Sequence, residues 1–202
     1  MASQFSATQP TSRPCAVIAK DELRARMKRR RAAIDTASRE QAAEMLARKL
    51  ALSDAWRQSE TVASFLSFGS EINTSPIDTL ARAQGKVIVY PRISEARTLT
   101  FHYWAPGEAL ERSVLGTQEP RPQARPISNA AIDLTLVPLL ACDPSGCRLG
   151  YGGGFYDRFL SSSDTLSVGL GFHWQLIDHV PGEKHDQRLH AFASDQELRF
   201  FT

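Results

Sequence analysis

Several features are missing from this chain of 202 residues, and each absence excludes a class of protein. No apolar run approaches the roughly 20 residues that cross a bilayer, and the start, MASQFSATQPTSRP, lacks the apolar core of a secretory signal. The three cysteines are an odd number and lack the spacing of a zinc site, which favours reduced thiols. We therefore expect a cytoplasmic protein with no membrane partner.

The composition is that of an ordinary globular protein. Hydrophobic residues make up 42% and charged residues 23% of the chain, and 202 residues can bury a substantial core in one domain. The polar start, which contains proline, predicts a disordered tail over residues 1–14. We expect a single domain over residues 15–202.

The net charge of +2 is unevenly spread. Residues 20–31 hold seven basic and two acidic side chains, while apolar residues recur at helical spacing from Val17 and Ile18 to Ile34. Two interpretations are open, a solvated amphipathic helix and a patch that binds nucleic acid. Because no aromatic residue is interleaved with these charges and no nucleic-acid-reading motif is present, we expect no nucleic-acid partner.

Residues 147–160, CRLGYGGGFYDRFL, form the stretch around which the chain is organised. Its closely spaced glycines disfavour helix and strand and predict a loop whose N–H groups converge on an anion, just before a helix over FYDRFL. A tight strand-to-helix connection is the alternative. The loop lacks the Gly-Lys-Ser/Thr ending of a P-loop, and no acidic residue follows at dinucleotide-binding spacing.

The residues that flank these glycines suit a nucleotide. Arg148 and Arg158 bracket the loop with fixed positive charge, and Asp157 is a hard oxygen ligand of the kind that Mg²⁺ prefers. Flat aromatic faces are offered by Tyr151, Phe155 and Tyr156. Three chemistries that favour a phosphate-bearing ligand therefore meet in one short segment.

Short apolar runs alternate with helical patterns, which predicts an α/β fold. We expect a three-layer sandwich with a mostly parallel central sheet flanked by helices, an N-terminal helical pair, and residues 134–138 as the central strand. The second helix is expected to be capped around Asp35 to Ser38 and to run to about Ala51, and a later helix to be capped by Ser75 and to end near Gly85. Strands are expected over residues 61–68, 86–92, 98–104 and 166–172, and residues 106–126 are expected to be irregular.

The run RLGYGGGFYDR closely resembles the signature of the 5-formyltetrahydrofolate cyclo-ligase family, also called 5,10-methenyltetrahydrofolate synthetases. Four further elements match the family's patterns in order, from Lys20 to Asp186: KDELR, FLSFGSEINT, GTQEP and PGEKHD. The resemblance implies an enzyme that uses ATP and Mg²⁺ to close 5-formyltetrahydrofolate into 5,10-methenyltetrahydrofolate. The implied route phosphorylates the formyl oxygen and releases ADP and phosphate.

The resemblance also implies which residues form the site. ATP is expected to contact Lys20, Arg24, Arg148, Leu149, Gly150, Tyr151, Gly152, Gly153, Gly154, Phe155 and Tyr156. The folate is expected to contact Leu66, Glu71, Tyr151, Gly152, Gly153, Gly154 and Phe155, with the Glu71 carboxylate facing the N–H donors of the pterin. Asp157 and Asp186 are the expected magnesium ligands, and Arg148 and Tyr151 the expected catalytic residues. The other basic residues of 20–31 are expected at the surface.

Several interpretations stay open on the sequence alone. Arg92 suits either a ligand anion or a structural salt bridge, Glu119 is a candidate for the site, and His185 suits either acid–base chemistry with Asp186 or the surface. The pairs at residues 189–190 and 194–195, Leu-His and Ser-Asp, depart from the Leu-Asp and Thr-Glu that are usual in the family.

Two other functional classes are the alternatives. An enzyme that acts on sugar phosphates or acyl-CoA without ATP could share this scaffold, because a fold does not determine a reaction. A nucleic-acid-binding module could use the basic helix and keep the glycine loop for structure. We expect a monomer whose partners are 5-formyltetrahydrofolate and ATP.

Overall fold

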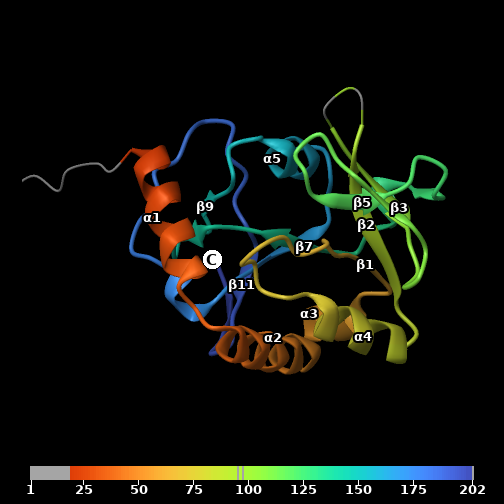
Figure 1. Ribbon diagram of the computed structural model, residues 1–202, viewed down its shortest axis with the longest axis horizontal. Coiled ribbons are helices and arrows are strands. Elements are labelled where there is room, and N and C mark those ends of the chain that lie inside the picture. The colour runs from red at the N-terminus through yellow and green to blue at the C-terminus, as the bar shows by residue number, and fades with distance from the viewer. Residues whose placement is uncertain (1–18, 95, 97, 202) are drawn as a thin grey trace, which may run out of the picture.

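The computed structural model describes residues 19–94, 96 and 98–201 (Figure 1). The tail expected over residues 1–14, Cys15, and the apolar positions Val17 and Ile18 lie outside the described residues. Among the described helices, none combines the length and the apolar character that crossing a membrane requires.

An eight-stranded sheet of order β12-β11-β10-β7-β1-β2-β3-β6 forms the middle layer. Its strands are β1 (Thr61–Ala63), β2 (Val87–Ile93), β3 (Leu99–Tyr103), β6 (Pro126–Ile127), β7 (Leu134–Pro138), β10 (Leu166–Leu170), β11 (Ala191–Ala193) and β12 (Leu198–Phe200). The five strands from β11 to β2 are parallel, and antiparallel strands lie at both edges. The predicted central strand is β7, whose apolar run pairs on both sides.

Helices cover both faces of this sheet (Figure 1). One face packs against α2 (Thr36–Ala51), α3 (Asp54–Gln58) and α4 (Ser75–Ala83), and the other against the short α5 (Phe155–Leu160). Helix α1 (Lys20–Ala32) packs Leu23 and Met27 against the small hairpin of β8 (Ala141–Cys142) and β9 (Arg148–Leu149). The expected three-layer α/β architecture and N-terminal helical pair are confirmed. The 3-10 turns are η1 (Asn129–Ala131) and η2 (His173–Gln175).

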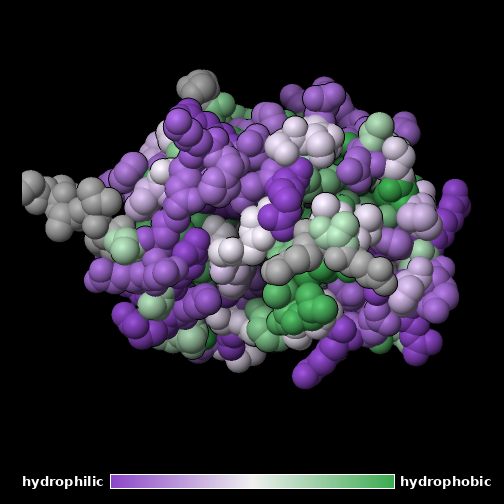
Figure 2. All heavy atoms as spheres, turned by 90° about the horizontal axis from the view of Figure 1, so that it is seen from above, coloured by the Kyte–Doolittle hydropathy of each residue, from purple (hydrophilic) through white to green (hydrophobic). Residues whose placement is uncertain are grey.

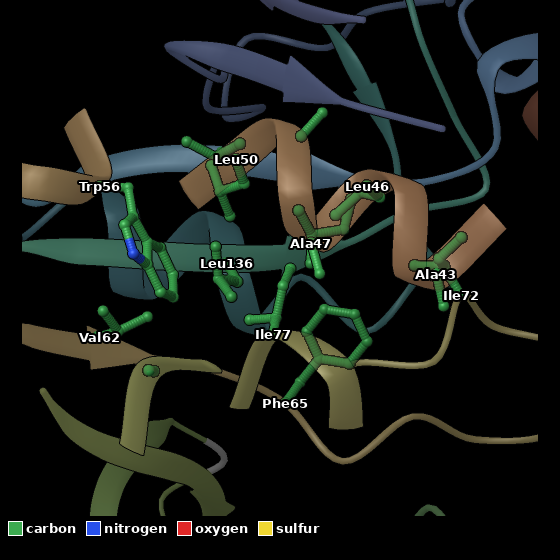
Figure 3. Close-up of a cluster of buried hydrophobic side chains, with 14 of the residues drawn as sticks. Ala43, Leu46, Ala47, Leu50, Trp56, Val62, Phe65, Ile72, Ile77 and Leu136 are labelled. Atoms are coloured by element: carbon green, nitrogen blue, oxygen red, sulfur yellow. The ribbon is translucent and has the colours of Figure 1, made fainter. Parts of the chain in front are cut away.

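Local sequence explains how α2 forms the larger core. The Asp35 side chain accepts a hydrogen bond from the Ser38 backbone N–H at 2.9 Å, which satisfies one of the free donors at the start of the helix. Leu46 and Leu50 then recur on one face and bury against the sheet, next to Leu136 of β7 (Figure 3). This cluster packs the helices of one outer layer against the sheet.

The strand expected over residues 61–68 is shorter in the structure, because β1 ends at Ala63. Beyond Ser64, side chains replace the ladder: the Thr74 hydroxyl donates to the Phe65 carbonyl at 2.7 Å, and the Ser67 hydroxyl donates to the Ile72 carbonyl at 2.9 Å. Such local side-chain bonds compete with strand pairing. The chain from 64 to 74 is therefore a pinned loop.

Two smaller expectations are wrong. Ser75 is the first residue of α4 rather than its cap. Thr74 precedes the helix, and its hydroxyl donates a hydrogen bond to the Phe65 carbonyl instead of capping the helix. Residues 106–126 are not irregular throughout, since they contain the hairpin of β4 (Leu110–Arg112) and β5 (Gln118–Pro120). Strands of three residues carry too little alternation to be read from a sequence.

Asp78, in the first turn of α4, is a buried carboxylate that makes stability depend on pH. Ser64 and Tyr90 donate to it at 2.7 and 2.8 Å, yet burial raises the pKa of Asp78 from 3.8 to about 6. The folded state therefore holds this proton where the unfolded state has lost it. The stability that this group contributes is fully present at a pH below 3.8. It falls by roughly 3 kcal/mol in all as the pH rises through about 6.

We predict that the unfolding free energy of the wild type, minus that of Asp78→Asn, falls by roughly 2 kcal/mol from about pH 4 to about pH 6.5. Urea unfolding of both proteins at a series of pH values measures this difference. A difference that stays constant across the series would contradict the assignment to Asp78.

Candidate functional site

A cavity of about 1050 Å³ opens where β1, β2 and β7 reach their carboxyl ends. Every site residue expected from the sequence lines it. They are Lys20 and Arg24 from α1, Leu66 and Glu71 from the loop after β1, residues 148–157 from the glycine loop and α5, and Asp186 from the segment before β11. A smaller cavity, at the opposite ends of β7 and β10, contains none of these residues. Ligands of open α/β sheets bind at such carboxyl ends.

The glycine loop turns the chain from β9 into α5 with a backbone that needs glycine. Gly152 and Gly154 have φ values of +100° and +64°, in the left-handed region where a side chain is disfavoured. A Cβ on Gly153 would lie 2.6 Å from the Phe155 ring. The run of glycines therefore has a geometric cause as well as the expected chemical one.

Arg148, the first residue of β9, is held rigidly behind the loop. Its side chain is only 4% exposed, and its Nη2 donates to Asp157 Oδ1 at 2.7 Å. The Gln187 backbone N–H donates to the same Asp157 oxygen at 3.1 Å. These bonds tie α5 to the segment that carries Asp186.

Two buried donors on this wall have no hydrogen-bond partner within the described part of the chain: Arg148 Nη1 and the Tyr156 hydroxyl. Burial and the charge of Glu71 raise the pKa of Tyr156, so its hydroxyl keeps the proton. An unpaired buried donor costs about 1–3 kcal/mol. Both atoms are thus suited to a ligand that brings hydrogen-bond acceptors, as a phosphate does.

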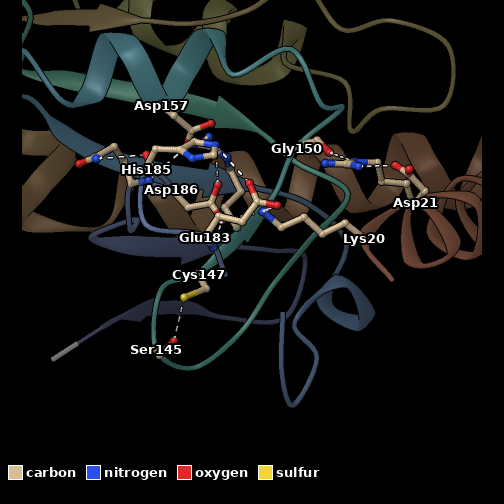
Figure 4. Close-up of polar contacts among 12 residues, drawn as sticks. Lys20, Asp21, Ser145, Cys147, Gly150, Asp157, Glu183, His185 and Asp186 are labelled. Atoms are coloured by element: carbon tan, nitrogen blue, oxygen red, sulfur yellow. Dashed lines mark hydrogen bonds and ion pairs between the residues drawn. The ribbon is translucent and has the colours of Figure 1, made fainter. Parts of the chain in front are cut away.

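Helix α1 contributes cations next to the glycine loop (Figure 4). Lys20 Nζ lies 2.8 Å from Asp186 Oδ2 and 3.3 Å from Glu183 Oε1, and Arg24 Nε donates to the Gly150 carbonyl at 3.1 Å. Burial alone would lower the pKa of Lys20, but its bonds to Asp186 and Glu183 raise it overall, so Lys20 stays charged. Burial likewise opposes ionisation of Asp186, and the bond from Lys20 outweighs it and lowers the pKa of Asp186.

The acidic side chains here suit a hard divalent cation. Ligand atoms of Glu183, His185 and Asp186 all lie within 4.8 Å of one another, and Asp157 is linked to this segment through Gln187 (Figure 4). Mg²⁺ prefers carboxylate oxygens and keeps several waters, so a few carboxylates at an accessible edge are sufficient. Among the described residues, Asp186 of the expected pair belongs to this group of ligand atoms, and Asp157 does not.

The far wall combines an acid with an aromatic ring. The Tyr151 hydroxyl donates to Glu71 Oε1, and the Phe68 backbone N–H donates to Glu71 Oε2 at 2.9 Å. Burial raises the pKa of Glu71 despite these two bonds. Tyr151 is 41% exposed, whereas Phe155 is 8% exposed and packs into the core.

Seen from above, hydrophilic side chains cover the end of the molecule that carries α1, and apolar side chains reach the surface nearer the middle (Figure 2).

Arg31 is a cavity residue that was not predicted from the sequence. It was expected at the surface with the other basic residues, but it is 5% exposed and lines the cavity. The reason is its register, because Leu23, Met27 and Arg31 follow one another at i, i+4 and i+8 and all three are buried. That spacing was visible in the sequence. Other lining residues that were not predicted include Lys28, Phe68, Leu115 and Glu183.

Comparison with known proteins identifies the family of this chain. The sequence model of the 5-formyltetrahydrofolate cyclo-ligase family matches residues 16–193. The chain belongs to this enzyme family. The 5-formyltetrahydrofolate cyclo-ligase of Escherichia coli K12 is 37% identical over 147 residues, which are 68% of this chain and 79% of that protein. The cyclo-ligase of Mycolicibacterium smegmatis is 32% identical over 175 residues, 83% of this chain and 89% of the relative.

A solved structure of a 5,10-methenyltetrahydrofolate synthetase, from Aquifex aeolicus, has the same fold. Its TM-score is 0.79 at 24% sequence identity, with 90% of this chain and 92% of that chain covered. The likeness over nearly the whole length supports the layered architecture described above.

The residues that the sequence left open in this cyclo-ligase family member have structural partners. Arg92 Nη1 lies 2.5 Å from Glu111 and 3.0 Å from Glu119, which is the salt bridge that was one of its two interpretations. Glu119 and His185 both line the cavity, and the His185 side chain is 71% exposed. In the divergent tail, His190 Nδ1 lies 2.8 Å from the Ser167 hydroxyl and Asp195 pairs with His173 at 3.0 Å.

Proposed function

We propose that this protein converts 5-formyltetrahydrofolate into 5,10-methenyltetrahydrofolate, with ATP as co-substrate and with release of ADP and phosphate. The observation that carries the proposal is the pair of buried, unpaired donors, Arg148 Nη1 and the Tyr156 hydroxyl, beside a glycine loop. At about 1050 Å³ the cavity is larger than most single-ligand pockets, which hold roughly 300–1,000 Å³, and this favours two ligands side by side.

The nucleotide phosphates are assigned to the wall between α1 and the glycine loop. Lys20, Arg24 and Arg148 provide positive charge, and the loop from Leu149 to Tyr156 provides backbone N–H groups at close approach. Mg²⁺, when bound, would be held by the carboxylates of Asp157 and Asp186 and would spread the charge of the triphosphate. Arg148 is already oriented by its bond to Asp157, so little reorganisation is needed when phosphate arrives.

The folate is assigned to the wall formed by Leu66, Glu71 and Tyr151. The Glu71 carboxylate accepts from the adjacent N–H donors of the amino-pyrimidine ring, and Tyr151 and Phe155 flank the pterin together with Gly152, Gly153 and Gly154. With both substrates in place, the formyl oxygen lies in line with the terminal phosphorus.

The chemistry then proceeds in two steps. The formyl oxygen attacks the terminal phosphorus and ADP leaves, with Arg148 stabilising the transferring group. N10 adds to the activated formyl carbon and loses its proton, and phosphate departs to leave the methenyl bridge. The second step joins two parts of one molecule, so the protein's main contribution is orientation.

We predict that the purified protein, mixed with 5-formyltetrahydrofolate, ATP and Mg²⁺, forms the strongly absorbing methenyl product with one ADP per turnover. Product absorbance and ADP release are followed together, and ATP is omitted in the control. Methenyl product formed at the same rate without ATP would contradict the proposal, as would ATP hydrolysis without methenyl product.

A further inference from the structure

Arg31 makes three hydrogen bonds that join separate walls of the cavity. Its Nε donates to Ser70 Oγ at 3.1 Å, its Nη1 to the Leu139 carbonyl at 3.3 Å, and its Nη2 to the Tyr151 hydroxyl oxygen at 2.7 Å. Ser70 belongs to the loop after β1, Leu139 to the turn after β7, and Tyr151 to the glycine loop. A buried guanidinium is stable only when its donors are satisfied, so these contacts fix its position.

The bond to Tyr151 determines where the tyrosine proton points. An arginine has donors and no acceptor, so the Tyr151 oxygen must accept from Arg31. The tyrosine proton is then free for Glu71, and the Tyr151 hydroxyl does donate to Glu71 Oε1. Burial and the charge of Glu71 raise the pKa of Tyr151, which keeps that proton in place. The result is a directed chain from Arg31 through Tyr151 to Glu71.

These linked hydrogen bonds orient the Glu71 carboxylate and still leave it able to accept further hydrogen bonds. Tyr151 holds Glu71 Oε1 and the Phe68 N–H holds Oε2, but an ionised carboxylate has about four acceptor sites. Each oxygen can therefore accept one further bond, as a pair of adjacent N–H donors requires. A carboxylate fixed on both oxygens loses less rotational freedom when it binds such a pair.

We infer that Arg31 is a positioning residue for the folate substrate: through the Tyr151 hydroxyl it holds the Glu71 carboxylate oriented and ionised for the amino-pyrimidine ring. The inference rests on the proposed function for the identity of the ligand. It assigns Arg31 no contact with the folate.

The test uses two single variants, their double variant and a matched control. Arg31→Met and Tyr151→Phe each remove a link in the series of hydrogen bonds from Arg31 through Tyr151 to Glu71. Each is expected to raise the Kd of 5-formyltetrahydrofolate, measured without ATP, about tenfold. Arg29→Met removes the same charge from an exposed position on the same helix and is expected to bind like the wild type. Thermal unfolding of each variant establishes that it is folded.

The double variant separates positioning from general support of the cavity. If Arg31 acts through Tyr151, then Arg31→Met adds no further loss of affinity in the Tyr151→Phe background. Losses that add, or an Arg31→Met variant that binds like the wild type, would overturn the inference. Should Arg31→Met fail to fold, the same cycle is run with Arg31→Lys, whose single ammonium cannot span the three acceptors.

A titration without ligand keeps this test independent of the proposed function. The charged and titratable groups near Glu71 are Arg31, with Lys28 over the Tyr151 ring, Tyr151 itself, and Tyr156 of α5. Removing the positive charge of Arg31 is expected to raise the Glu71 pKa, read from labelled carboxyl resonances with Glu71→Gln for assignment. An unchanged pKa would refute the inference even if the folate proved not to be the substrate, and a wild type that fails to bind folate would refute only the proposed function.

Discussion

Replacing Arg148 by methionine is expected to lower kcat about 10²–10³-fold, the usual effect of removing one preorganised donor from a transition state. The side chain is 4% exposed, one of its nitrogens is fixed on Asp157, and the other is buried without a partner in the described chain. In the proposed reaction, Arg148 is therefore already oriented for the charge that develops on the transferring phosphoryl group. The KM for 5-formyltetrahydrofolate should change much less than kcat.

Steady-state kinetics of Arg148→Met and Arg148→Lys, with ATP and folate varied separately, measure this effect. Lysine keeps the charge but cannot bond Asp157 and a phosphoryl oxygen in the same geometry, so it should recover only part of the loss. An unchanged kcat in the methionine variant, or a loss confined to the KM for folate, would remove Arg148 from the phosphoryl-transfer step.

The variant Leu136→Ala is expected to lower the unfolding free energy by about 3–5 kcal/mol. Leu136 is fully buried at the centre of β7, and it contacts the core that α2 and α4 form against the sheet (Figure 3). Strands pair with β7 on both sides, so the surroundings cannot collapse into the space that the smaller side chain leaves.

Urea unfolding of Leu136→Ala is compared with that of Leu52→Ala, whose side chain follows α2 and is 69% exposed. The control should stay within about 0.5 kcal/mol of the wild type. Equal effects of the two substitutions would mean that the centre of the sheet adapts to a cavity, contrary to the packing described.

Much of the fold could be read from the sequence because its determinants are local. The apolar run at residues 134–138 predicts a strand buried on both faces, and Asp35 predicts the start of α2. The strand expected over 61–68 failed for the opposite reason, since the bond from Thr74 to Phe65 ends it and joins residues nine positions apart. Pattern reading sees side-chain type and spacing, and does not see such a competing bond.

The amino-acid sequence by itself identified many of the residues that surround the cavity. A glycine run, its flanking charges and four ordered motifs each supply residues that line this one space. Two of the motifs have a simple reason to be there, because KDELR begins α1 and FLSFGSEINT follows the carboxyl end of β1. Only the tertiary structure decided how those residues are paired. Arg31 meets Tyr151 across 120 positions of the chain and Lys20 meets Asp186 across 166. The charges and hydroxyls of such groups are satisfied by whatever the folded chain brings within hydrogen-bonding distance, and spacing along a sequence does not encode that distance.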